Sequence, residues 1–533
     1  MLSDILILLP NREREQEKEI EKYNIILCDN NDKIYSYNEY IKNYNDNDND
    51  NNNELFIKRK WSIENCTNEM LEDIIKKNIN IYSLEFHYGF NQSITRLKVC
   101  KSLESLEVLK FGYCFDQSIE VLENCKSLKS LTFNDYFNQS IDSLRNLSSL
   151  KLLKFGKKFN QKIEALKNCK SLEVLKFGDK FDQSIEVLEN CKSLKSLIVN
   201  SNFNQSIEVL KNCKSLKALI LNGFNFNQSI ESLENCRELE LLHFGKLFNQ
   251  RINSLKNLEL LQSLKFNCGF NQSIEALENC KSLQSLIFGN SFDKSIEVLK
   301  NCKLLESLYF FAQSEFDQSI ESLQNLEQLK LLSFSKKFNQ SIQPLQNLKK
   351  LQSLTFGNSF NKSIEALQNC KSLQSLKFGD SFNQNIEVLK NLEQLQSLIF
   401  GKNFDQCIQS LQNCKSLQIL SFGQSFNQSI EELQNLEQLK LLTFGNESYY
   451  SKFNKSIEIL PNLRSLQSFI LNKEFNKSLE KIPNLQPLEL LILYQGLNHS
   501  DELIKSLQTL YTIKISRIHG IHNSIIQIEI LKN

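Results

Sequence analysis

A unit of about 22 residues recurs along this chain and limits the folds that it can adopt. Phe followed by Asn or Asp recurs eighteen times, with Phe at positions 90, 115, 137, 159, 181, 203, 226, 248, 270, 292, 316, 338, 360, 382, 404, 426, 453 and 475. A repeat of this length cannot bury its apolar face alone, so neighbouring copies must stack into a solenoid. Composition agrees, because 37 Phe against 1 Trp and 5 Pro in 533 residues indicate one unit used repeatedly.

Each copy predicts a short strand followed by a helical return. Leu131 and Phe133 alternate with polar residues, which is the period of a strand with one buried face. Ile119, Leu122 and Cys125 are spaced by three, which fits a short α- or 3₁₀-helical segment. We therefore predict a curved, right-handed α/β solenoid of about 18–20 repeats, with one continuous parallel β-sheet and short helical returns.

Two polar columns accompany the apolar ones. The residue after the turn Phe is Asn or Asp in every copy, beginning with Asn91 and Asp116, and Asn also recurs nine residues after that Phe. Asn side chains both donate and accept, so we expect ladders of hydrogen bonds between successive coils. A serine such as Ser118 stands where it can cap the helical segment.

The strand, the turn and the residues after it resemble the leucine-rich repeat and, more closely, the FNIP repeat of social amoebae and amoeba-infecting giant viruses. The matching residues in one copy are Leu376, Phe378, Gly379, Phe382, Asn383, Gln384 and Ile386. This chain departs from that family at Ser140, where the family has Pro after Gln. The resemblance implies a solenoid used for protein–protein contact, often joined to an N-terminal F-box, and implies no catalytic residue.

The cysteines follow the repeat. Ten of the 15 Cys occupy one column that holds Leu in the other copies: Cys100, Cys125, Cys169, Cys191, Cys213, Cys236, Cys280, Cys302, Cys370 and Cys414. A position that accepts Leu requires a buried apolar group, so these are predicted to be core thiols and not disulfides or zinc ligands. Reduced thiols, together with Asn-x-Ser sequons inside the turns, predict a cytoplasmic protein.

The sequence shows no pattern of residues that is typical of a catalytic or cofactor-binding site. The chain has 5 His, and only His519 and His522 have metal-like spacing, which is weak evidence for a site. We predict no enzyme activity, catalytic residue, cofactor or metal. A net charge of +1 argues against nucleic acid as a partner, although Lys110, Lys154 and Lys176 form a basic stripe. The apolar run of residues 5–9 is too short to span a membrane, so no membrane association is expected.

A protein partner is expected on the solvent side of the strands or on the rim beside them. The column between the strand Leu and Phe becomes apolar in the middle of the array, and two insertions at one strand-to-turn junction add aromatic residues. The candidate partner-binding residues are Ile198, Ile220, Ile287, Tyr309, Phe311, Tyr449 and Tyr450. The alternative is that the strand residues are β-favouring side chains without a partner.

The sequence predicts that the chain is divided into three segments. Residues 1–67 are a cap or an F-box-like segment with an Asn/Asp-rich stretch at 43–54, residues 68–516 are the array, and residues 517–533 are a C-terminal capping strand. The predicted function is a monomeric, non-catalytic protein–protein interaction scaffold with a partner that the sequence does not identify. The alternative is a substrate-recognition adaptor of a cullin–RING ubiquitin ligase, acting through the N-terminal segment.

Overall fold

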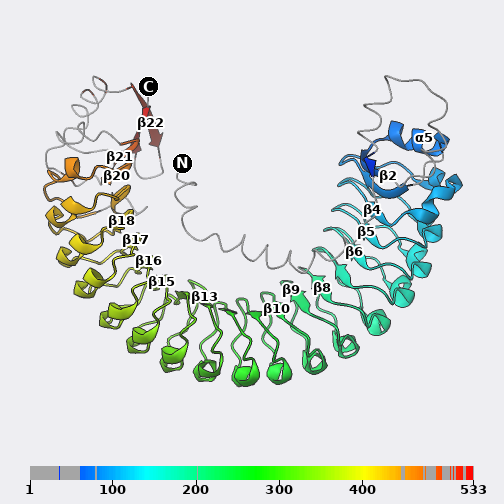
Figure 1. Ribbon diagram of the computed structural model, residues 1–533, viewed down its shortest axis with the longest axis horizontal. Helices are drawn as coiled ribbons and strands as arrows, with labels where there is room; N and C mark the ends of the chain where they lie inside the picture. The colour runs from blue at the N-terminus through cyan, green and yellow to red at the C-terminus, as the bar shows by residue number, and fades with distance from the viewer. Residues whose placement is uncertain are drawn as a thin grey trace. The chain divides into compact units, whose positions relative to one another are not determined.

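The chain forms two compact units, Met1–Asn267 and Cys268–Asn533, which are described separately. The computed structural model describes residues 35–36, 61–77, 81–200, 202–445, 451–471, 475, 488–494, 505, 508, 512–519 and 524–531. In each unit the strands lie on the inner side of the stacked coils and the helical segments lie on the outer side (Figure 1).

The first unit opens with a strand and a helix that precede the regular coils. Its strands are β1 (Tyr35–Ser36), β2 (Trp61–Cys66), β3 (Ile81–Phe86), β4 (Val108–Lys110), β5 (Ser130–Thr132), β6 (Leu152–Lys154), β7 (Val174–Lys176), β8 (Ser196–Val199), β9 (Ala218–Leu221), β10 (Leu241–Phe244) and β11 (Ser263–Lys265). Its helices are α5 (Asn68–Lys77) and the 3₁₀ segments η2 (Thr95–Val99), η3 (Lys101–Ser105), η4 (Glu120–Asn124), η5 (Asp142–Asn146), η6 (Glu164–Asn168), η7 (Glu186–Asn190), η8 (Glu208–Asn212), η9 (Glu231–Asn235) and η10 (Asn253–Asn257).

The second unit repeats the same coil and ends in longer strands. Its strands are β12 (Ser285–Phe288), β13 (Ser307–Phe310), β14 (Leu331–Ser333), β15 (Ser353–Thr355), β16 (Ser375–Lys377), β17 (Ser397–Ile399), β18 (Ile419–Phe422), β19 (Leu441–Phe444), β20 (Ser468–Leu471), β21 (Leu490–Tyr494), β22 (Thr512–His519) and β23 (Ser524–Leu531). Its 3₁₀ segments are η11 (Glu275–Asn279), η12 (Glu297–Asn301), η13 (Glu321–Asn325), η14 (Gln343–Asn347), η15 (Glu365–Asn369), η16 (Glu387–Asn391), η17 (Gln409–Asn413), η18 (Glu431–Asn435) and η19 (Leu460–Asn462).

The strands of successive coils pair in parallel and in phase. Leu109, Leu131 and Leu153 are register partners on β4, β5 and β6, and all three are buried. Because side chains alternate along a strand, the residues on either side of these leucines point to the opposite, inner face of the sheet. The predicted fold class, a solenoid with parallel strands and short helical returns, is confirmed within each unit.

The returns are 3₁₀ segments, which settles a choice that the spacing of three left open. In η7, Leu188 N donates to Ile185 O and Cys191 N donates to Leu188 O, each at 2.9 Å, and both are i to i+3 bonds. Ser184 Oγ accepts from the backbone N–H of Glu186 at 3.2 Å. Ser184 therefore caps the segment, although it lies one residue before Ile185, which occupies the N-cap position.

Phenylalanines form a continuous spine inside the coils of each unit. In the second unit, the ring of Phe382 lies 3.8 Å from that of Phe378 in the same coil and 6.1 Å from that of Phe404 in the next, measured between centroids. All three rings are buried and nearly parallel to one another. These contacts add stacking attraction to the burial of large apolar surface, so the repeated use of Phe is explained by the core.

The column after the turn Phe forms the expected ladder between coils. The backbone N–H of Asp116 donates to Asn91 Oδ1 at 2.8 Å, and that of Asn138 donates to Asp116 Oδ1 at 2.9 Å. Either Asn or Asp can occupy this column, because each hydrogen bond of the ladder needs only a side-chain acceptor oxygen. Gln117 Nε2 adds a second bond to Asn91 Oδ1 at 3.2 Å, a role for the following Gln that the sequence analysis did not predict.

The second asparagine column does not repeat one bond from coil to coil. Asn168 donates to the backbone oxygen of Arg145 at 3.3 Å, whereas Asn257 donates to the carboxylate of Glu234 at 3.2 Å. These side chains are exposed, so their hydrogen bonds follow the local neighbours.

The cysteine column is buried in the core, as predicted. Burial raises the pKa of the Cys414 thiol to about 12, and its Sγ lies 3.4 Å from the backbone oxygen of Leu389 in the preceding coil. All described cysteines are free thiols. Because the pKa of the Cys414 thiol is well above neutral pH, this thiol stays protonated, and a protonated thiol is unreactive.

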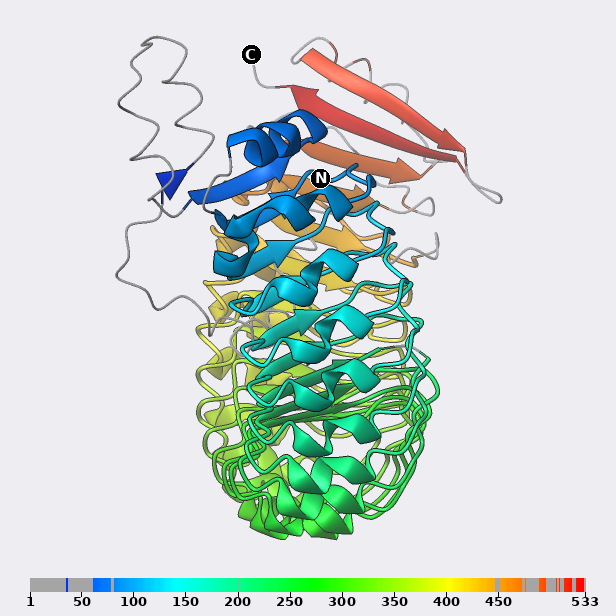
Figure 2. The ribbon, with the colours of Figure 1, turned by 90° about the vertical axis from the view of Figure 1, so that its right-hand side faces the viewer.

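Different elements close the two ends of the array. At the N-terminal end, β2 pairs with β3, and α5 contributes buried Leu71 and Ile74 to the core (Figure 2). At the other end, the described residues of the segment 517–533, which are 517–519 and 524–531, lie in the antiparallel strands β22 and β23, and β23 also pairs with β21. The stretch at 43–54 lies outside the described residues.

Candidate functional site

The inner face of the first unit carries the predicted partner column. Lys110, Thr132, Lys154, Lys176 and Ile198 occupy equivalent positions on β4 to β8 and are register partners from strand to strand. Ile220, His243 and Lys265 continue the column on β9 to β11. This surface runs from basic to apolar, as the sequence indicated.

The apolar part of that column is buried, which corrects the expectation that it is exposed. Ile198 and Ile220 are only 5% and 2% accessible, and they form one cluster with Ala218 and Leu241. Two strand columns contribute to the cluster, and the sequence analysis considered only one of them. That Ile198 and Ile220 bind a partner stays a prediction, and such binding would require these two side chains to become exposed.

His243 extends the buried part of this face. Its Nε2 lies 3.1 Å from Ser263 Oγ, and burial, with a smaller contribution from Lys265, lowers the pKa of His243 to about 3. The ring is therefore neutral at physiological pH and acts as a packed, hydrogen-bonded residue.

In the second unit the structure brings together three of the predicted residues. Ile287 and Tyr309 are register partners on β12 and β13, and the rings of Tyr309 and Phe311 meet edge to face with centroids 5.8 Å apart. All three side chains are half-buried. They form a compact apolar patch beside the insertion, and that these residues bind a partner stays a prediction. Tyr449 and Tyr450 lie outside the described residues.

Sequence reasoning missed a row of tyrosines at the surface of the first unit. Tyr88, Tyr113 and Tyr136 follow β3, β4 and β5, at the strand-to-turn junction. The rings of Tyr88 and Tyr113 stack with centroids 4.9 Å apart, and those of Tyr113 and Tyr136 meet edge to face at 5.2 Å. Lys158 Nζ lies 3.6 Å from the centroid of the Tyr136 ring, a cation–π contact at one end of the row.

The two ends of this tyrosine row are exposed although their side chains are large and partly apolar, and Tyr113 between them is half-buried. Tyr88 is 63% accessible and Tyr136 is 41% accessible. The sequence signal was available, because these residues depart from the repeat consensus one or two positions before the turn Phe. The regular turn Phe dominates the aromatic pattern of the repeat and obscures this signal.

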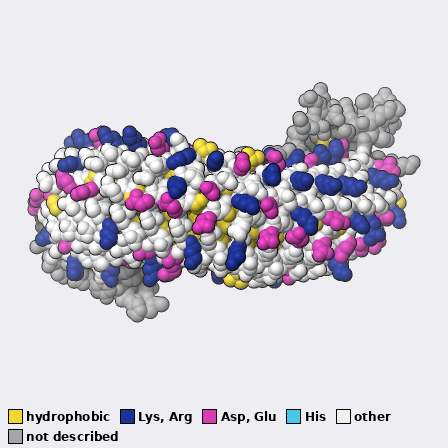
Figure 3. Space-filling model, turned by 90° about the horizontal axis from the view of Figure 1, so that it is seen from below, with side chains coloured by type: hydrophobic (Ala, Val, Ile, Leu, Met, Phe, Trp, Pro, Cys, Tyr) yellow, Lys and Arg dark blue, Asp and Glu magenta, His cyan; other side chains and the backbone are white. Residues whose placement is uncertain are grey.

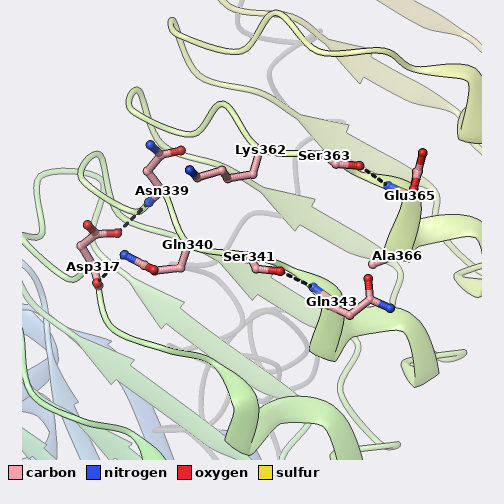
Figure 4. A pocket seen from close by; sticks show the side chains of 9 residues that line it. All are labelled: Asp317, Asn339, Gln340, Ser341, Gln343, Lys362, Ser363, Glu365 and Ala366. Carbon is pink, nitrogen blue, oxygen red and sulfur yellow. Dashed lines mark hydrogen bonds between the residues drawn. The ribbon is translucent and has the colours of Figure 1, made fainter.

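A polar groove of about 670 Å³ lies between coils of the second unit (Figure 4). Asp317, Asn339 and Gln340 line it, but Asp317 Oδ1 already accepts from Asn339 N at 2.8 Å and its backbone oxygen accepts from Gln340 Nε2 at 3.1 Å. Ser363 Oγ accepts from Glu365 N at 3.3 Å. These polar groups are used by the ladder and the caps, so the groove is a consequence of coil geometry.

The outer surface carries both signs of charge. Figure 3 shows Lys and Arg side chains interspersed with Asp and Glu on one face. On the 3₁₀ segments, Lys300 Nζ pairs with Glu297 at 2.9 Å and Lys390 Nζ pairs with Glu387 at 2.7 Å. Such exposed pairs contribute little free energy and indicate a solvated surface.

Chemistry-bearing clusters are not found in the part of the chain that the structure describes. Among these residues, no group of three or more His, Cys, Asp or Glu could hold a metal ion. His519 lies on β22, and His522 lies outside the described residues. Within the same described ranges, none of the helices has both the length and the apolar character needed to cross a bilayer.

Known proteins were compared with this chain by sequence and by structure. No protein-family model matches it, and no curated protein matches it. CroV588, a giant-virus protein described as a novel circular LRR structure, is 32% identical with a TM-score of 0.55, over 80% of this chain and 68% of that one.

Two other solved structures resemble the chain in fold alone. The LRR protein LIC12759 of Leptospira interrogans has a TM-score of 0.59 at 15% identity, over 79% of this chain and 98% of that one. A TDR receptor has a TM-score of 0.57 at 16% identity, over 79% of this chain and 82% of that one.

Proposed function

Because the chain belongs to the leucine-rich-repeat proteins, we propose that it is a non-catalytic scaffold that binds another protein and acts as a monomer in the cytoplasm. We assign its repeats to the FNIP-like type. The Phe-Asn-Gln turn supports this assignment, since Phe382 belongs to the spine while Asn383 and Gln384 belong to the ladder. Free, buried cysteines such as Cys414 fit a reducing compartment.

One observation carries the proposal: the stacked row of Tyr88, Tyr113 and Tyr136, which is exposed at both ends. Large side chains that the core does not need are retained at one rim of three consecutive coils. Tyr is among the residue types that contribute most to protein interfaces, because it offers a rigid apolar surface together with a hydroxyl group. Mutual stacking also reduces the entropy that the side chains would lose when a partner covers them.

The test is affinity purification of the tagged full-length chain, with quantitative mass spectrometry of the retained proteins. We expect the Tyr88→Ser, Tyr136→Ser double variant to lose a protein that the wild type retains, by at least about tenfold. Leu304→Ser is the matched control, because Leu304 is an exposed apolar residue of the other unit. Equal retention by all three chains contradicts a role for the tyrosine row.

The predicted sites in the insertions need a parallel experiment. Tyr309→Ser with Phe311→Ser, and Tyr449→Ser with Tyr450→Ser, are compared with the tyrosine-row variant in the same purification. If a partner is lost only from one of these variants, the binding surface lies at the insertion that carries the substitutions.

The ligase-adaptor alternative depends on residues 1–67. Of this segment, Trp61–Cys66 forms β2, which pairs with β3 as part of the sheet, so it supports the cap more than a separate adaptor domain. Ligase subunits among the proteins retained by the full-length chain would favour the adaptor, and their absence beside a retained partner would favour the scaffold.

A further inference from the structure

Two lysines on the inner face of the first unit make no ion pair with any residue that the structure describes. Lys154 and Lys176 are register partners on the adjacent strands β6 and β7, so their backbones lie about 4.8 Å apart. The preceding residues Leu153 and Leu175 are fully buried, which places both lysines on the inner face. Both lysines are half-buried, and neither takes part in an ion pair in the described ranges.

Other lysines of the same coils are neutralised. At the start of the strands, lysine and glutamate alternate between neighbouring coils and pair directly, as in Lys129–Glu107 at 2.6 Å, Lys195–Glu173 at 2.6 Å and Lys217–Glu240 at 2.9 Å. In the inner column itself, Lys110 Nζ pairs with Glu85 at 3.3 Å. Lys154 and Lys176 therefore differ from these neighbouring lysines, each of which has a carboxylate partner.

This arrangement is electrostatically unfavourable in the free chain. Burial, followed by the charges of Lys176 and Lys110, lowers the pKa of Lys154. Two ammonium groups that share a partly dehydrated surface repel each other, and water screens them less than it screens fully exposed charges. A ligand that brings negative charge to this surface would remove the repulsion and gain charge-assisted hydrogen bonds.

The surroundings favour a peptide over a nucleic acid. Leu152 and Val174 lie two residues before the lysines on the same face and are nearly buried, and Ile198 is the next register partner of Lys176. Apolar neighbours match the side chains of a peptide, whereas a phosphodiester chain requires an extended positive field. The net charge of the chain is only +1.

We infer that Lys154 and Lys176 form a site for an acidic segment of the protein partner, in which two carboxylates separated by one residue each bind one lysine. Side chains at i and i+2 of an extended peptide are about 6.6–6.8 Å apart, and two flexible lysine side chains that start about 4.8 Å apart can span this distance. The inference deepens the proposed scaffold function and rests on it.

The test uses the full-length chain and a fluorescein-labelled hexaglutamate peptide, with binding followed by fluorescence anisotropy. We expect saturable binding that weakens as salt is raised, and that is about tenfold weaker for the Lys154→Gln, Lys176→Gln double variant. Lys154→Arg with Lys176→Arg should retain binding. Lys377→Gln is the matched control, because Lys377 occupies the same column in the second unit, between Thr355 and Ile399, without a lysine neighbour.

Several outcomes overturn the inference. One is equal hexaglutamate binding by wild type and the glutamine double variant, and another is absence of peptide binding to the wild type. Tighter binding of a six-nucleotide oligothymidylate, lost in the same variant, would assign the lysines to a nucleic acid. A lower thermal midpoint of the double variant would show that the lysines stabilise the fold, whereas repulsion predicts an unchanged or higher one.

These results are separable from the failure of the scaffold proposal. If the tagged wild-type chain retains a partner that the tyrosine-row variant loses, but hexaglutamate does not bind, only the acidic-segment inference is rejected. If hexaglutamate binds specifically and the tyrosine row has no effect, the site stands and the observation behind the proposed function does not.

Discussion

Asn383 offers the most direct test of the ladder that joins successive coils. Its Oδ1 accepts from Asp405 N at 2.9 Å and from Gln406 Nε2 at 3.0 Å, while its own N–H donates to Asn361 Oδ1 at 2.9 Å. Asn383→Ala removes the acceptor for two donors and leaves the third bond in place. The backbone N–H of Asp405 is half-buried and cannot turn to water, whereas the Gln406 amide can rotate and rehydrate.

The expected cost is about 2 kcal/mol, because an orphaned, partly buried donor costs about 1–3 kcal/mol and a rehydrated amide loses less. Asn383→Asp is the matched control, because it keeps an acceptor oxygen at the same place. Aspartate occurs in two consecutive rungs elsewhere, where Asp317 N donates to Asp293 Oδ1 at 3.2 Å, so a neighbouring Asp405 is tolerated. We expect this variant to stay within about 0.5 kcal/mol of the wild type.

Native-state hydrogen exchange resolves the effect locally, which suits an array whose coils need not unfold together. The Asp405 amide should exchange about thirtyfold faster in Asn383→Ala, the equivalent of about 2 kcal/mol, and near the wild-type rate in Asn383→Asp. Unchanged exchange in Asn383→Ala would refute the acceptor role. An equally large increase in Asn383→Asp would show that the asparagine amide group, and not its oxygen, sustains the ladder.

Three further predictions concern packing and protonation. A Cβ on Gly401 would lie 2.1 Å from a carbonyl oxygen of the preceding coil, so Gly401→Ala should lower the thermal midpoint markedly, whereas Gly89→Ala, whose Cβ would approach no atom closer than 3.7 Å, should not. Burial raises the pKa of Cys414 to about 12, so iodoacetamide at pH 8 should label exposed Cys407 and leave Cys414 unlabelled until urea is added, as peptide mass spectrometry can show. Burial lowers the pKa of His243 to about 3, so the unfolded chain, with a pKa near 6.5, takes up the proton first and stability contributed by neutral His243 is lost as pH falls from about 6.5 to 3. His243→Gln should flatten that part of the pH dependence of urea unfolding, and an unchanged profile would contradict the burial of the ring.

Much of the fold followed from the repeat because its cause is local and periodic. The alternation around Leu131 and the regular return of Phe133 and Phe137 predicted the strands, the in-phase register and the spine, since each copy must present the same face to the next. The Leu-for-Cys exchange predicted core thiols for the same reason. The residues at one repeat position show which side chains a single structural environment accepts, so the burial of that position can be inferred from the sequence alone.

The candidate site shows what the sequence by itself could not determine. The composition of the inner column was evident, but not that Ile198 and Ile220 are buried, nor that Lys154 and Lys176, unlike Lys110, make no ion pair with the residues that the structure describes. Those properties depend on which side chains from other strands lie alongside, and a repeat pattern gives only the strand order. The sequence determined the coil and its stacking, because these depend on periodic burial. The 3₁₀ form of the returns, the stacked tyrosines and the lysines without an ion pair among the described residues required the three-dimensional structure, because they depend on distances between particular atoms.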